Sequence, residues 1–319
     1  MPRRGPTIAD TVLNEIREHG PQPLDALARA VLEAGRTRAK DPQRAVMAAM
    51  ESHPDLARDL DGRWCSLSQQ LDGAIFTTRL TALERADEIV LVRDGLSLVE
   101  RLTLRPRPFV SGGDVHLDFF GEFFELPWPS DVSTDELHEV IGDDLMADLV
   151  GLLRDLGLPP DADDEESVHD LLWETRDTRL LHGPLGWLPP LGGRQLLGIR
   201  LRDGSFETLA LDRRDVTGPH VGIVGARIAR LAHQVIGPDA SWFGPPAIPL
   251  AELLELVATE EPELLRRPLP PISEVVTRGG LEVFDGLVGH PGTDWEGLGL
   301  MAHLEPEDAW GYEPPETIH

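Results

Sequence analysis

Residues 7–67 carry the most regular pattern in the chain, and this pattern limits what the N-terminal part can fold into. Apolar residues recur at helical spacing in two successive runs, each closed by a glycine. Asp41-Pro42 predicts the start of a third helix, because aspartate caps a helix N-terminus and proline fits the first turn. An Asp61-Gly62 turn signal, followed by Trp64 and Leu67 on an expected strand, then predicts a short terminal hairpin.

Three helices and a hairpin that carries a tryptophan are typical of a winged helix, which we predict for residues 1–70. The residues resemble the HARE-HTH winged helix, a family that includes the N-terminal domain of the RNA polymerase delta subunit. The resemblance rests on the apolar run Ile8–Ile16, Pro23-Leu24 at the second helix, Asp41-Pro42 at the third, and the closing Asp-Gly-Arg-Trp-Cys-Ser-Leu. It implies a cytoplasmic adaptor associated with chromatin, restriction or transcription, without catalytic residues of its own.

In winged helices the third helix usually enters the major groove and the wing touches the DNA backbone. The candidate DNA-contacting residues are those of the third helix, the loop before it and the wing: Arg36, Arg38, Lys40, Gln43, Arg44 and Arg63. Residues 1–64, however, hold ten basic and ten acidic residues, whereas a DNA-reading domain is usually clearly basic. DNA contact and protein contact both remain open for this module.

The charge of the chain is concentrated behind the module. The sequence has 56 acidic and 29 basic residues, a formal charge of −27, and all of the excess lies in residues 65–319. Such a body repels phosphates, so we do not expect it to be a nucleic-acid surface. The acidity either serves solubility or forms a surface for a protein partner. Lys40 is the only lysine, a bias towards arginine that is typical of high-GC bacterial genomes.

Short strand-like runs and amphipathic helices follow residue 70, so the predicted fold class is α+β: a winged helix followed by a mixed α/β body. We expect a hairpin-rich unit at 71–130, a mixed helical and β body at 131–303, and an acidic tail at 304–319. Residues 202–205, Arg-Asp-Gly-Ser, are the strongest hairpin signal. A long amphipathic helix is predicted from Ser133 onwards.

Three local patterns in the body predict specific roles. Thr81 and Glu84 form a capping-box pattern that opens a short helix. Leu96–Leu102 fits a helix or a strand. Gly225 lies in a run that resembles part of a dinucleotide-binding loop but lacks its third glycine and its acidic residue, so we interpret it as a packing glycine in a helix.

Two polar clusters are candidates for a metal site. His116 and Asp118 alternate with apolar residues, which also fits the solvent side of a half-buried strand. His290 and Asp294 lie in a glycine-rich stretch, which also fits a loop beside the acidic tail. We interpret both clusters as structural and predict no metal ligands.

The sequence lacks the motifs of common enzyme classes. P-loop, HExxH and GxSxG patterns are absent, and one cysteine, Cys65, cannot form a CxxC zinc site or an internal disulfide. We interpret Cys65 as a packed small residue. We predict no catalytic residue and no cofactor. Without a signal peptide or an apolar run of membrane-spanning length, the expected location is cytoplasmic, with no membrane partner.

The leading hypothesis is a non-catalytic adaptor or regulator, in which the winged helix contacts DNA or a transcription or defence complex and the acidic body binds a protein partner. The first alternative is a purely protein-interacting structural subunit that does not bind DNA. The second is a metal-dependent hydrolase built on His116 and Asp118, or on His290 and Asp294.

Overall fold

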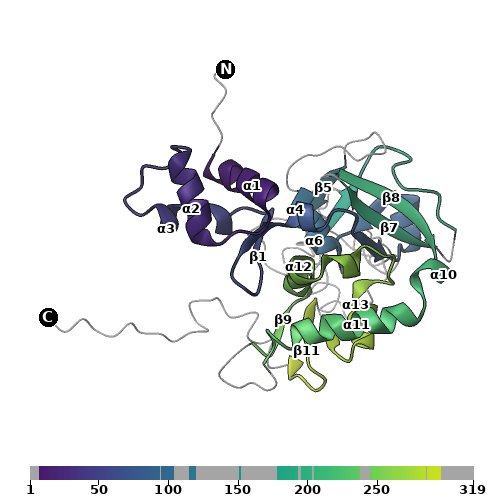
Figure 1. Cartoon of the computed structure of the whole chain (residues 1–319). Helices are drawn as coiled ribbons and strands as arrows, with labels where there is room; N and C mark the ends of the chain where they lie inside the picture. The colour runs from purple at the N-terminus through teal and green to yellow at the C-terminus, as the bar shows by residue number, and fades with distance from the viewer. Residues whose placement is uncertain are drawn as a thin grey trace, which may run out of the picture.

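The computed structural model confirms the α+β fold class: helices combine with antiparallel sheets, and three helices with a hairpin form the N-terminal end (Figure 1). The structure describes residues 7–93, 95–103, 115–119, 151, 178–192, 195–202, 205–237, 245–284 and 286–295. No helix among them is long and apolar enough to cross a bilayer.

The N-terminal module has the predicted order. Its elements are α1 (Ile8–His19), α2 (Leu24–Glu33), α3 (Pro42–Glu51), β1 (Leu56–Arg58) and β2 (Trp64–Ser66). Asp41 caps α3 as expected, since its carboxylate accepts a hydrogen bond from the Arg44 amide at 3.1 Å. The three helices and the hairpin share one core, formed by Val12, Leu13, Ile16, Leu27, Ala28, Val31, Val46, Met50, Leu56 and Trp64.

Three small antiparallel sheets form the β part of the body. The first has the order β3-β7-β8, made of β3 (Ile75–Thr78), β7 (Gln195–Arg202) and β8 (Ser205–Asp212). The second has the order β4-β6-β5, made of β4 (Ile89–Leu91), β6 (Arg179–His182) and β5 (His116–Phe119). The third has the order β10-β11-β9, made of β9 (Ala247–Pro249), β10 (Glu282–Phe284) and β11 (Leu287–Gly289).

Strands from either side of residue 130, where we expected a boundary, pair within the first two sheets. Thr77 lies opposite Gly198, and Leu117 lies opposite Leu181. One apolar core joins these strands to the helices of the body. The long helix expected from Ser133, residue 130 itself and the tail 304–319 lie outside the described residues.

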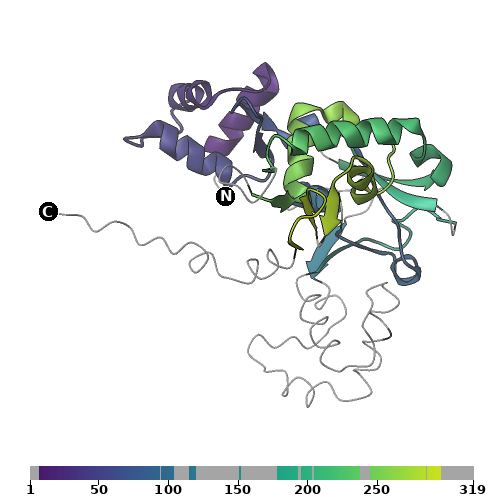
Figure 2. The ribbon, with the colours of Figure 1, turned by 90° about the horizontal axis from the view of Figure 1, so that it is seen from below.

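Helices cover the sheets and complete the body. They are α4 (Leu67–Gln70), α5 (Ala82–Ala86), α6 (Leu96–Thr103), α10 (Arg213–Val216), α11 (Pro219–Ala232), α12 (Leu250–Glu260), the 3-10 helix η1 (Pro262–Leu265) and α13 (Ile272–Arg278). The capping box at Thr81 opens α5 as predicted, and the segment that fitted a helix or a strand is α6. Figure 2 shows α11 running along one side of the body with α13 against it.

The structure confirms the interpretation of Gly225 as a packing glycine. A Cβ atom at this position would lie 2.5 Å from the carbonyl oxygen of Val275 and 3.0 Å from the amide nitrogen of Gly279. The backbones of α11 and α13 therefore approach each other more closely than any side chain at Gly225 would allow.

Candidate nucleic-acid interface

Four basic side chains project from the connection between α2 and α3 and from the first turn of α3. We call Arg36, Arg38, Lys40 and Arg44 the basic tip. The chain turns after α2 at Gly35, whose φ of +64° favours glycine. All four side chains are exposed, and none forms an ion pair with another described residue. The basic tip is thus a group of uncompensated cations on a protein that is otherwise strongly acidic.

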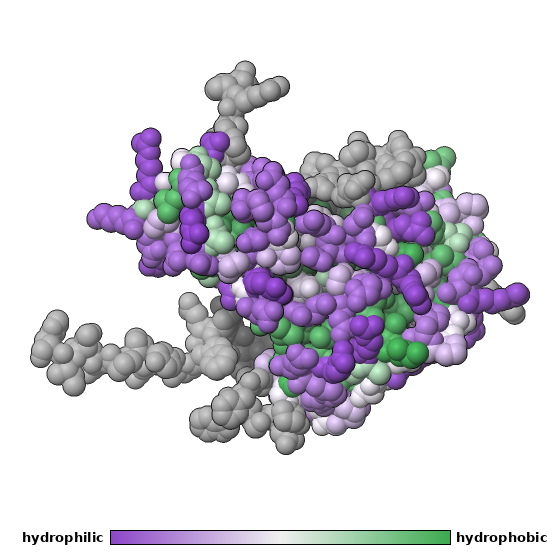
Figure 3. All heavy atoms as spheres, in the orientation of Figure 1, coloured by the Kyte–Doolittle hydropathy of each residue, from purple (hydrophilic) through white to green (hydrophobic). Residues whose placement is uncertain are grey.

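The basic tip lies at the end of the molecule away from the body. In Figure 1, α2 and α3 are on the far side of the module, while the β1–β2 hairpin lies beside α12. In Figure 3, hydrophilic side chains project from this end. Only one acidic residue, Asp41, falls within residues 34–50, and its carboxylate is bound at the N-terminus of α3.

The outer face of α3 is mixed in charge. Gln43 and Arg44 are exposed on its first turn, where the predicted DNA contacts place them. Further along, Met47 is half-buried and its sulfur accepts a hydrogen bond from Arg58 at 3.4 Å. Glu51 is exposed at the end of the helix. On α3 itself, positive charge is therefore present only in the first turn, and Arg58 of β1 is the cation beside Met47.

Arg63 differs from the other candidates because nearby carboxylates engage it. Its Nε donates to Asp59 at 2.8 Å, and its Nη2 lies 3.1 Å from Asp61. The hydrogen bond that Arg63 donates to the Asp59 carboxylate raises the pKa of Arg63 above its ordinary value. The structure places this guanidinium on the hairpin, apart from the basic tip, with its charge already balanced.

The hairpin, which would be the wing, is enclosed on both faces. Leu56 and Trp64 pack into the core of the module, whereas Ala57 and Cys65 pack into the core of the body. At its turn, the amide of Leu60 donates to the Glu260 carboxylate of α12 at 2.6 Å. This wing has a carboxylate where an ordinary wing would meet phosphate, so contact with DNA through it is disfavoured.

Cys65 lies inside this junction, as its interpretation as a packed residue requires. It is 1% exposed, and its thiol donates to the carbonyl of Ala57 at 3.5 Å. Burial, followed by the negative charge of Asp59, raises the thiol pKa to about 12. The thiolate is the reactive form of cysteine, so Cys65 is chemically inert in the folded protein.

The cluster at His116 and Asp118 has a third member that sequence reasoning missed. His182 on β6 lies opposite His116, with 5.4 Å between the ring centroids, and its Nε2 is 2.6 Å from Oδ2 of Asp118. His182 is 64 residues from Asp118, and only the pairing of β5 with β6 brings the two together. No local sequence pattern predicts that Asp118 has a partner 64 residues away in the chain.

The second cluster is arranged differently. The His290 ring stacks on His233, at the end of α11, with 4.8 Å between centroids and 12° between ring planes. The carbonyl of His290 accepts a hydrogen bond from Oγ1 of Thr293 at 2.7 Å, which closes a tight turn. Across the described part of the chain, no group of three or more His, Cys, Asp or Glu side chains is placed to hold a metal ion.

In comparisons with known proteins, no protein family, no curated protein and no solved structure matches the chain.

Proposed function

We propose that the protein is a non-catalytic adaptor of the HARE-HTH type, which contacts duplex DNA through the basic tip and binds a protein partner through its acidic body. The observation that carries this proposal is the basic tip itself. Arg36, Arg38, Lys40 and Arg44 are exposed, unpaired among the described residues and remote from the body. A cytoplasmic location belongs to the same proposal.

Electrostatics restricts how DNA would approach. Lysine and arginine side chains bind the duplex by releasing counterions from phosphates. With a net charge of −27, the chain repels DNA over most of its surface. An end-on approach to the basic tip combines attraction with the greatest distance from the acidic body. Because Arg44 is the only cation on the outer face of α3, most contacts would be to phosphate, and sequence preference would be weak.

Salt-dependent binding of the full chain to a short random-sequence duplex, measured by fluorescence anisotropy, tests the proposal. Four phosphate contacts predict a slope of about −3.6 for the logarithm of the binding constant against the logarithm of salt concentration. Affinity should then fall roughly 100-fold between about 50 and 200 mM salt. The double variant Arg38→Ala with Arg44→Ala should weaken binding and reduce the slope by about 2.

A matched control changes the net charge equally at the other end of the molecule. Arg213 and Arg214 are exposed on α10, which Figure 1 shows far from the module. Arg213→Ala with Arg214→Ala should leave the slope unchanged. Undetectable binding at low salt, or equal losses in the two double variants, would remove DNA from the proposed function.

The enclosed hairpin favours a second candidate, a structural subunit that binds only proteins. A wing packed between two cores serves as a connector, and the mixed charge of α3 suits a protein surface as well as a phosphate. Failure of the salt experiment would leave this candidate. No observation on the described residues favours a metal-dependent hydrolase.

A further inference from the structure

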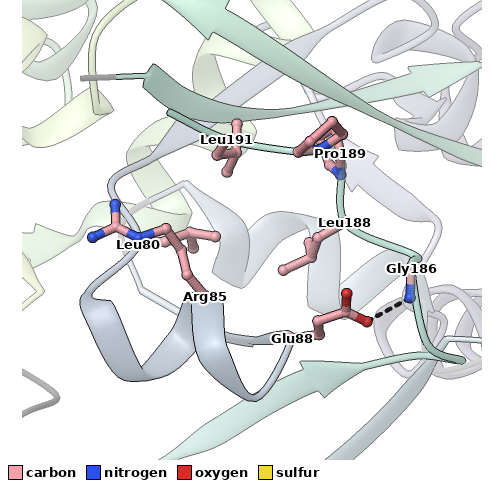
Figure 4. Close-up of a pocket in the computed structure, with 8 residues that line it drawn as sticks. Leu80, Arg85, Glu88, Gly186, Leu188, Pro189 and Leu191 are labelled. Atoms are coloured by element: carbon pink, nitrogen blue, oxygen red, sulfur yellow. Dashed lines mark hydrogen bonds between the residues drawn. The ribbon is translucent and has the colours of Figure 1, made fainter. Parts of the chain in front are cut away.

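The body contains an open pocket of about 400 Å³ between α5 and residues 186–191 (Figure 4). Its lining combines apolar side chains with one cation and one anion: Leu80, Arg85, Glu88, Gly186, Leu188, Pro189, Pro190 and Leu191. Figure 4 shows Leu80, Leu188 and Leu191 around the pocket, with Arg85 at one side and Glu88 at the other. The volume lies at the lower end of the range for small-molecule sites.

The wall at Glu88 is held in a conformation that a free chain would avoid. Glu88 has φ of +53°, the only positive value at a non-glycine position among the described residues. Two hydrogen bonds hold it there: the Gly186 amide donates to Oε2 at 2.6 Å, and the Trp187 indole donates to the Glu88 carbonyl at 2.5 Å. Backbone strain of this kind is concentrated at active sites and ligand-binding sites. Pro189 and Pro190 stiffen the facing wall.

The charge at the pocket is asymmetric. Glu88 is engaged by the Gly186 amide, whereas Arg85 is exposed and forms no ion pair with the described residues. The neighbouring Glu84 is fully buried and pairs with Arg93 at 2.7 Å, so it does not neutralise Arg85. The pocket therefore presents the Arg85 guanidinium at one side and the Glu88 carboxylate, held by the Gly186 amide, at the other, with apolar surface between them.

We propose that this pocket binds a small amphipathic carboxylate, with its apolar chain on Leu80, Leu188 and Leu191 and its carboxylate on Arg85. The carboxylate would lie at the Arg85 side, away from Glu88, because a guanidinium binds a carboxylate by charge-assisted hydrogen bonds. The leucines supply the apolar contact. The pocket shares no residue with the basic tip, so this site stands or falls independently of DNA binding.

Titration of the isotope-labelled full chain with hexanoate, followed by amide NMR shifts, tests the site. For a ligand of this size, the expected Kd is on the order of 1 mM. Saturable shifts should be confined to the amides of Leu80, Arg85, Glu88, residues 186–188 and Leu191. Acetate lacks the apolar chain and 1-hexanol lacks the charge, so both should bind more weakly than hexanoate. For 1-hexanol the loss should be up to about 5-fold, because an exposed ion pair contributes at most about 1 kcal/mol.

Two charge-removing variants separate a specific site from general attraction. Arg85→Gln should bind hexanoate no more tightly than 1-hexanol, because the Glu88 carboxylate remains in the pocket. Arg278→Gln, which removes an exposed arginine from the end of α13, should behave like the unmodified protein. Shifts spread over the surface, equal affinity for hexanoate and acetate, or equal effects of the two variants would overturn the proposal.

Discussion

Replacement of Gly225 by alanine provides the sharpest test of the packing between α11 and α13. The added methyl group would lie 2.5 Å from the Val275 carbonyl oxygen, about 0.9 Å inside the 3.4 Å at which ordinary contact begins. The other atoms that it would meet are the amide nitrogen and Cα of Gly279, so the clash is with the backbone of Val275, in α13, and of Gly279, its C-cap residue. Neither can move unless that segment moves with it.

Gly222 supplies a matched control on the same helix. It is exposed, and a methyl group added there would have no atom within 4 Å. Alanine is favoured over glycine in a helix by about 1 kcal/mol, and both variants gain that term. Overpacking costs about 1–3 kcal/mol and occasionally more. A clash with backbone atoms costs an amount at the upper end of this range, because the backbone cannot easily move. We therefore expect Gly225→Ala to lower the free energy of unfolding by about 2 kcal/mol and Gly222→Ala to raise it by about 0.5–1 kcal/mol.

Urea unfolding followed by far-UV circular dichroism measures both variants against the unmodified chain. The midpoints should move in opposite directions, with a separation of about 3 kcal/mol in unfolding free energy. Equal stability of the two alanine variants would refute the argument, because it would mean that α11 and α13 do not meet backbone to backbone.

Two further predictions concern buried groups. Glu84 is fully buried, pairs with Arg93 and accepts hydrogen bonds from the amides of Thr81 and Leu91. Glu84→Gln should therefore lower the free energy of unfolding in urea by about 1–3 kcal/mol. An unchanged midpoint would contradict this. The Cys65 thiol, with its pKa raised to about 12, should not react with a thiol reagent at about pH 8 until the protein unfolds. The unfolded thiol ionises near pH 8.5, so the free energy of unfolding should fall as the pH rises from there towards 12, by up to about 1.4 kcal/mol per pH unit. Cys65→Ala should lack this contribution to the pH dependence of stability.

Features that depend on neighbouring residues were predictable from the sequence. Asp41 and Thr81 cap their helices because the capping partner lies three residues further on, within the same turn. The hairpin of β7 and β8 formed where the turn signal placed it. Arg63 was predicted as a DNA contact, although Asp59 and Asp61 stand close enough in sequence to have suggested its ion pairs.

Features that depend on distant segments were not predictable. Alternation along a strand reveals one buried face, so the hairpin showed its tryptophan but not that Ala57 and Cys65 are covered by the body. Leu67 was predicted on a strand, but α4 begins there, because the chain turns into the body core at this point. His182 could not be assigned to Asp118 without knowing that β5 pairs with β6.

The enclosed hairpin has a mechanical consequence. A winged helix joined by a flexible linker would swing, and the effective concentration of anything bound to it would fall as the linker lengthened. Here β1 and β2 contribute side chains to both cores, and the Leu60 amide donates a hydrogen bond to Glu260. The orientation of the module relative to the body is therefore fixed. A molecule bound at the basic tip would keep one orientation and one distance relative to a molecule bound by the body.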